Sequence, residues 1–195
     1  MSNLGAFTGI PRDALASIFA TDGKSPTTFA RTNLPRIGMY DSASDSGNVA
    51  LTTQIMTSVP IFLQAGDVVT NLSFRSGATA AGTPTNWWFA LYSNAATPAL
   101  LAQTADQTST AWAASTTKTV ALASAQTIRT TGIYWAAIMV KATTVPTLVG
   151  AGVAPAIATG ETSLAQNSGS ALTATAPATI ASPTAQLFAP YCLIT

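Results

Sequence analysis

Two stretches of this sequence are apolar at every position, and they limit the possible folds more strongly than any other feature. They are Trp87–Leu91 and Ile133–Val140. A half-buried strand alternates apolar and polar residues, whereas a strand that is covered on both faces is apolar throughout. Both runs therefore predict central strands of a sheet that is covered on both sides.

Alternation of apolar and polar residues predicts further strands around these two. It runs through residues 55–63, 68–75 and 117–122. In the second stretch, the alternation places Val68, Leu72 and Phe74 on one face. Pro60 interrupts the first stretch and has no backbone N–H, so we expect that strand to lie at a sheet edge or to contain a bulge.

The spacing of these patterns predicts an all-β fold. We expect a jelly-roll-like antiparallel β-sandwich of about eight strands, because turn signals separate short strands throughout the chain. The sandwich domain is predicted over residues 49–195. Within it, residues 154–186 carry one charge, Glu161, and are expected to form a long Ala/Thr/Ser-rich loop over the domain. Residues 187–195 are expected to form a closing strand, since a free tail would be less apolar.

Residues 1–48, here called the arm, differ from the rest of the chain. One short helix is predicted over about residues 11–20, with Pro11 at its first position. Its apolar face carries Leu15, Ile18 and Phe19, and Phe29 follows in a turn-rich stretch. These four side chains are candidate anchor residues. The arm has too many apolar residues for a solvated linker, so it packs either on a neighbouring subunit or back on its own domain.

Charge is unusually scarce in this chain. Only 8% of residues are charged, whereas a soluble domain has about 25%. This composition is explained if other subunits cover much of the surface, or if the chain forms a robust Thr-rich β structure. The net charge of +1 provides no field for nucleic acid. No apolar run approaches the roughly 20 residues that cross a bilayer, so we expect neither nucleic-acid binding nor membrane insertion.

Residues near the two ends of the sequence bear on where the protein is made and on its cysteine chemistry. Arg12 and Asp13 stand where a signal peptide would be apolar, so synthesis in a cytoplasm is expected. Cys192 is the single cysteine, which excludes an intrachain disulfide. Its apolar neighbours predict a buried core thiol.

Motifs for catalysis and metal binding are weak. The chain has no histidine, which removes the usual general base and the commonest zinc ligand. Ser115–Lys118 has the S-x-x-K spacing but falls in a predicted strand instead of a helical turn. Residues 41–48, DSASDSGN, have oxygen ligands but match no EF-hand loop. Asp67, Asp106 and Glu161 are too few and scattered for a paired-carboxylate mechanism. We expect no catalytic residues, metal or cofactor.

Aromatic side chains and one loop remain as candidate contact sites. The rings of the two apolar runs could stack on sugars, but packing in the core is the more economical interpretation. Trp112 lies between Ala and Thr residues in a predicted loop, so it is expected to be exposed and is the candidate glycan contact. The small-residue loop 76–86, with Thr83, Pro84 and Thr85, is the candidate partner contact because it allows close backbone approach.

Three segments together resemble a known domain. They are VVTNLSFRSGATAAGTPTNWWFALYSN at residues 68–94, LLAQTADQTSTAW at 100–112 and TTGIYWAAIMVKA at 130–142. They are similar to a domain that occurs repeatedly in tailed phages of actinobacteria, and the similarity covers roughly residues 51–153. The loop and the aromatic strand that follows it are the most distinctive part.

The resemblance implies a structural role. Such proteins are virion components, either minor tail or fibre-like proteins or head decoration proteins, and they carry no catalytic residues. We therefore expect a virion protein that contacts other virion proteins and copies of itself, as a homotrimer. The alternative is a glycan-binding adhesion module that recognises the host cell surface.

Overall fold

The computed structural model describes residues 31–33, 48–153, 156 and 163–195. These residues form thirteen strands and no helix. The strands are β1 (Arg31–Thr32), β2 (Asn48–Ala50), β3 (Met56–Leu63), β4 (Val68–Arg75), β5 (Gly82–Tyr92), β6 (Leu100–Gln103), β7 (Thr117–Thr127), β8 (Gly132–Thr144), β9 (Thr147–Gly152), β10 (Gln166–Ser168), β11 (Thr184–Ala185), β12 (Phe188–Pro190) and β13 (Cys192–Ile194).

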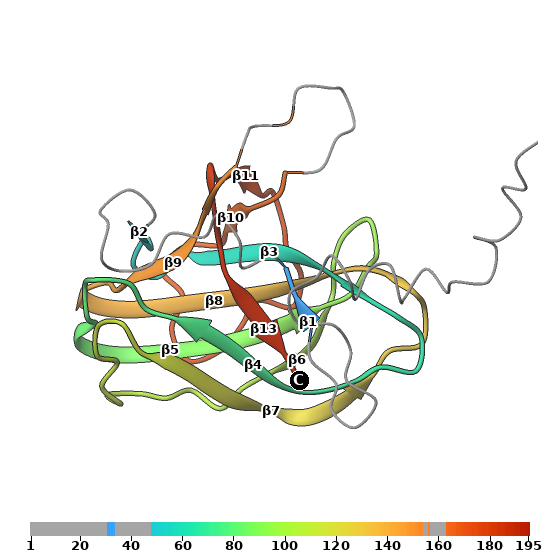
Figure 1. The fold of residues 1–195 in the computed structure, drawn as a ribbon, viewed down its shortest axis with the longest axis horizontal. Coiled ribbons are helices and arrows are strands. Elements are labelled where there is room, and N and C mark those ends of the chain that lie inside the picture. Colours follow the sequence, from blue (N-terminus) through green and yellow to red (C-terminus); the bar gives the residue numbers. More distant parts are fainter. Residues whose placement is uncertain (1–30, 34–47, 154–155, 157–162) are drawn as a thin grey trace, which may run out of the picture.

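The strands form two facing antiparallel sheets and a small third one (Figure 1). One sheet has the order β1-β13-β4-β7, and the other has the order β11-β10-β3-β8-β5-β6. The third sheet has the order β12-β9-β2. The prediction of an all-β, sandwich-like architecture is confirmed. The predicted helix over residues 11–20 lies outside the described residues.

Alternate side chains of the six-stranded sheet fill the space between the two large sheets. The Phe74 ring of β4 packs on the Phe89 ring of β5, with ring centroids 4.9 Å apart. Packing of this kind buries large apolar areas and is the main favourable contribution to folding. The largest buried side chains of this inner core are Ile61, Leu63, Leu72, Phe74, Trp87, Phe89, Leu91, Trp112 and Ile138.

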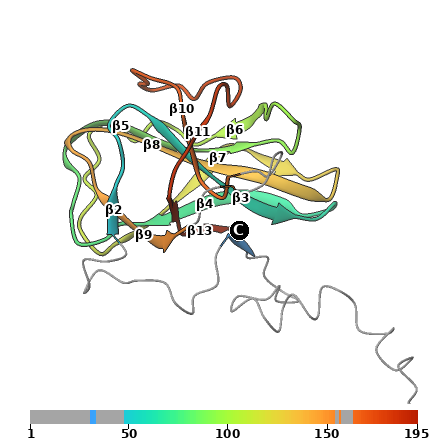
Figure 2. The same cartoon turned by 90° about the horizontal axis from the view of Figure 1, so that it is seen from above.

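The outer face of the same sheet is also buried, because the C-terminal part of the chain crosses it (Figure 2). Trp88 and Tyr92 point to this side and each donates a hydrogen bond to the covering segment. The Trp88 Nε1 donates to the Thr173 carbonyl at 2.6 Å, and the Tyr92 hydroxyl donates to the Pro177 carbonyl at 2.8 Å. The prediction that Trp87–Leu91 forms a strand with two buried faces is confirmed.

A β-bulge changes which side chains of β4 point into the core. The register between β4 and β7 shifts between Val69 and Asn71. As a result Val69 is fully buried, whereas Val68 is 46% exposed. The prediction that Val68 shares the buried face of Leu72 and Phe74 is wrong, because the extra residue reverses the alternation on one side of the bulge.

The predicted closing strand is divided into two strands that join different sheets. β12 pairs with β9, and β13 pairs with β4. β1, which the sequence assigned to the arm, pairs with the other edge of β13. The Asn33 side chain donates to the Pro190 carbonyl and accepts from the Cys192 N–H, both at 2.7 Å. Residues 31–33 are therefore attached to the sandwich.

Two buried, weakly acidic groups cause the stability of the fold to decline at alkaline pH. Burial raises the pKa of the Tyr92 hydroxyl and of the Cys192 thiol above their ordinary values of 10.0 and 9.0; a backbone hydrogen bond at Ser73 partly opposes the shift for Cys192. The protonated forms favour the folded state, so this contribution is complete below the ordinary values and declines as pH rises above them.

We expect the free energy of unfolding to fall above about pH 9, by at most about 1.4 kcal/mol per pH unit for each group. Denaturant titrations over this range measure the slope. Cys192→Ala and Tyr92→Phe should each make the decline shallower. A slope that is the same in both variants and in the native sequence would contradict the assignment.

Candidate functional site

Trp112 is not an exposed ligand platform, and the prediction that it is exposed is wrong. Its side chain is 1% exposed. The ring packs against Trp87 and Phe89, with centroids at 5.1 and 5.8 Å. Its Nε1 donates to the Thr116 carbonyl at 3.1 Å, and its own carbonyl accepts from the Ala81 N–H at 2.9 Å. The loop that carries Trp112 thus inserts the ring into the core between the sheets.

The predicted contact loop 76–86 is shorter than expected. β5 begins at Gly82, so Thr83, Pro84 and Thr85 belong to a strand that pairs with β8. Thr83 and Thr85 are exposed, and Pro84 is buried. The register shifts between Pro84 and Asn86, where a proline is tolerated because it has no N–H to pair. The four candidate anchor residues, Leu15, Ile18, Phe19 and Phe29, lie outside the described residues.

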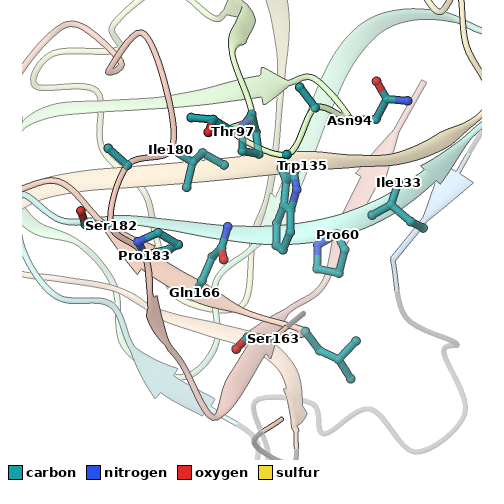
Figure 3. Close-up of a pocket in the computed structure, with 15 residues that line it drawn as sticks. Pro60, Asn94, Thr97, Ile133, Trp135, Ser163, Gln166, Ile180, Ser182 and Pro183 are labelled. Atoms are coloured by element: carbon teal, nitrogen blue, oxygen red, sulfur yellow. The ribbon is translucent and has the colours of Figure 1, made fainter. Parts of the chain in front are cut away.

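A cavity of about 710 Å³ opens on the outer face of the six-stranded sheet (Figure 3). It lies over β3 and β8, between the 94–98 loop and the chain that leads into and follows β10. Its position follows from Pro60. Among the described residues, β10 pairs with β3 only over Met56–Ser58, so β3 is a sheet edge there from Pro60 onward, which is one of the two outcomes that the proline predicted. The covering segment therefore leaves this end of the sheet open.

Two polar side chains line the middle of the cavity, and neither is hydrogen-bonded to another described side chain or backbone group. Figure 3 shows Trp135 and Gln166 next to one another in the middle, with Pro60 and Pro183 on either side. Trp135 is 6% exposed and Gln166 is 7% exposed. Neither the Trp135 indole nor the Gln166 amide forms a hydrogen bond within the part of the chain that the structure describes, and the polar atoms of both open into the cavity. The other three indoles all donate to backbone carbonyls.

A third polar group, the Asn94 amide, lies at the rim because Gly132 has no side chain. A Cβ placed on Gly132 would lie 2.8 Å from the Asn94 Nδ2, closer than real Cβ contacts. Asn94 also has no hydrogen bond from its side chain to any described residue. Gly132 thus makes room for the side chain of Asn94, a residue that lines the cavity.

The other lining residues that the structure describes are apolar or hydroxylic, and none of them is charged. Ile180, Ile133 and Leu164 supply aliphatic surface, and the last two are exposed. Ser163 and Ser182 supply hydroxyl groups. None of the described lining residues is Asp, Glu, Lys or Arg. The cavity is therefore suited to a neutral ligand with both apolar and hydroxyl surface.

Sequence reasoning missed this cavity, although one signal was present. Pro60 indicated an edge, and Trp135 is paired with it across β3 and β8. The sequence could not indicate that Gln166 would reach the same place, because it lies in the predicted loop 154–186.

The carboxylates that were weighed for catalysis have structural roles where the structure describes them. Asp106 accepts from the Trp87 N–H at 3.0 Å and from the Asn86 side-chain amide at 2.6 Å. Asp67 accepts from the Gln64 N–H at 2.8 Å. Lys118 of the S-x-x-K match lies in β7, with its Nζ 5.9 Å from the centroid of a Trp87 ring. Within the described ranges, no three His, Cys, Asp or Glu residues cluster as metal ligands would.

Two comparisons with known proteins were negative. No protein-family model matches the chain, and no curated protein matches it. Over the residues that the structure covers, no helix is both long enough and apolar enough to pass through a bilayer. The assignment of a ligand to the cavity therefore rests on the cavity's own side chains.

Proposed function

We propose that this protein is a non-enzymatic structural component of a tailed-phage virion. In this proposal the arm attaches it to the particle, and the sandwich faces outward or packs against copies of itself as a homotrimer. It would serve as a minor tail or fibre-like protein or as a head decoration protein. The sequence resemblance over residues 51–153 supports this class.

The observation that carries the proposal is an apolar surface on a chain with almost no charge. Only 8% of the residues are charged. Phe62 and Ile133 pair across β3 and β8, and both are exposed. Val68, Leu164 and Leu187 are also exposed. Exposed apolar groups in a chain with little charge favour contact with other subunits, because burial there removes apolar area from water.

We further propose that the sandwich is of the jelly-roll class. The order β3-β8-β5-β6 faces β13-β4-β7. The chain changes sheet between β3 and β4, between β4 and β5, and again on either side of β7. Repeated crossing between two sheets supports the Greek-key connections of a jelly roll.

Deleting residues 2–30 is expected to remove the protein from the particle while leaving the sandwich folded. The deletion keeps Arg31–Thr32, so the pairing of β1 with β13 is retained. Incorporation is measured as copy number in purified particles by quantitative mass spectrometry, and folding as the thermal unfolding midpoint. Ile18→Asp with Phe19→Asp should give the same loss of incorporation. A normal copy number with residues 2–30 deleted would rule out attachment through this part of the arm.

The second candidate function is the glycan-binding adhesion module. The sequence placed the glycan contact at Trp112, but this residue is buried and cannot form such a contact. The cavity at Trp135 and Gln166 supports a glycan-binding function at a different place on the protein. It combines apolar rings with amide groups that have no hydrogen bond to a described residue. The two functions are compatible, because an adhesive surface can belong to a structural protein.

A further inference from the structure

We propose that the cavity at Trp135 and Gln166 binds a neutral saccharide of one or two sugar rings. This inference deepens the adhesion candidate and does not depend on the protein being part of a virion. It assigns Gln166 as the central polar contact, the Trp135 indole as a second donor, and the Asn94 amide as a contact at the rim.

The first argument is that the polar atoms of Gln166 and Trp135 open into the cavity and are hydrogen-bonded to no described residue. A ligand that displaced water from these atoms without replacing its hydrogen bonds would bind weakly, because each atom would then be buried and unsatisfied. Both side chains are more than nine-tenths buried, and both face the same cavity (Figure 3). A ligand that fills the cavity must therefore supply hydrogen-bonding groups at this point.

The second argument is that the available donors and acceptors match hydroxyl groups. The Gln166 amide offers two N–H donors and a carbonyl acceptor, and the Trp135 indole offers one N–H donor. A hydroxyl group can both donate and accept, so adjacent sugar hydroxyls can pair with one amide and one indole. A purely apolar ligand would leave these groups unpaired.

The third argument is the apolar surface beside these polar groups. Pro60 and Ile180 flank the Trp135 ring in the cavity. A pyranose ring has one apolar face of C–H groups and a rim of hydroxyls, so it can pack on such surface while its rim reaches the amides. Ligand sites commonly combine apolar lining with a few placed polar groups.

The charge and size of the cavity narrow the ligand class. None of the described lining residues is ionised, so an anionic sugar would lose hydration without gaining a cationic partner among them. The volume of about 710 Å³ lies within the roughly 300–1,000 Å³ of small-ligand sites. A neutral mono- or disaccharide unit, including a unit within a longer glycan, fits both limits.

The test is a titration of the full chain with neutral and charged trisaccharides, followed through the indole N–H signals in NMR. The probes are maltotriose, cellotriose, mannotriose and chitotriose, with trigalacturonate as the anionic probe. Trp135→Phe identifies the Trp135 signal by its disappearance. We expect at least one neutral probe to shift this signal in a saturable manner, and the anionic probe to leave it unchanged.

Three substitutions test the assigned contacts. Gln166→Leu keeps most of the side-chain volume and removes the amide, so we expect the affinity to fall at least tenfold. Gly132→Ala pushes the Asn94 amide away and should lower affinity by a smaller factor. Gln126→Leu changes the same residue type on β7 of the opposite sheet, and should leave affinity unchanged. Thermal unfolding of each variant shows whether the fold is retained.

Several outcomes would overturn the proposal. One is no saturable shift of the Trp135 signal with any neutral probe. Another is an unchanged affinity in folded Gln166→Leu. A third is that a synthetic peptide of residues 2–30 shifts this signal while the saccharides do not, which would make the cavity a docking site for the arm. Loss of saccharide binding leaves the arm-deletion experiment unaffected, so the two proposals fail separately.

Discussion

Trp112→Ala is expected to lower the free energy of unfolding by about 3–5 kcal/mol, as for other large aromatic residues removed from a core. The ring is fully buried and contacts both Trp87 and Phe89. Its removal leaves a cavity between the sheets and leaves the Thr116 carbonyl without the indole donor. Chemical denaturation of the purified protein measures the change.

Two further substitutions give this prediction its controls. Trp112→Phe keeps an aromatic ring in the core and should lose clearly less stability than Trp112→Ala. Leu187→Ala removes an exposed side chain and should change stability by no more than about 0.5 kcal/mol. If Trp112→Ala were as stable as the Leu187 variant, Trp112 would not belong to the core, and the exposed position expected from the sequence would be restored.

Gly150→Ala is expected to destabilise the protein by about 1–3 kcal/mol through overpacking. A Cβ on Gly150 would overlap the Ala189 carbonyl and would lie 2.9 Å from the Pro190 Cα. These are backbone atoms of β12, the strand that pairs with β9. They cannot move aside as a flexible side chain can, so the two strands must separate.

Gly152→Ala is the matched control for this substitution. Gly152 lies in the same strand and pairs with the same partner, β12. The nearest atom to a Cβ there is the Leu187 carbonyl oxygen, at 4.0 Å. We expect Gly152→Ala to be near neutral in the same thermal and chemical unfolding measurements. Equal losses in the two variants would show that close approach of β12 is not the cause.

Local patterns predicted the strands well, because alternation depends on backbone geometry alone. The apolar run Trp87–Leu91 indicated a strand covered on both faces, and β5 is buried by a facing sheet on one side and by the C-terminal segment on the other. The same reasoning identified β8. Pro60 likewise indicated an edge, since a missing N–H is a property of the residue itself.

Features that depend on distant parts of the chain could not be predicted in this way. The bulge at Val69–Asn71 accompanies the hydrogen bonds that Thr70 and Asn71 donate from their N–H groups to the carbonyl of Thr195, the last residue. Trp112 has the sequence surroundings of an exposed loop, and its burial depends on where that loop crosses the sandwich. In both cases tertiary contacts overrode the local pattern.

The candidate cavity could not be predicted from the sequence for the same reason. It requires β10 to end its pairing at Ser58, so that Pro60 and Trp135 remain uncovered by that strand. It also requires Gln166, from a low-complexity stretch, to project beside Trp135. Neither condition has a periodic signature.

The central claim, that the protein is a structural part of a virion, is tested most directly by its location. Purified particles labelled with an antibody against the sandwich domain, and viewed by electron microscopy, provide this measurement. The proposal predicts label at one defined position on the head or the tail of every particle. Particles that carry no label, from lysates in which the intact protein is abundant and free, would contradict it.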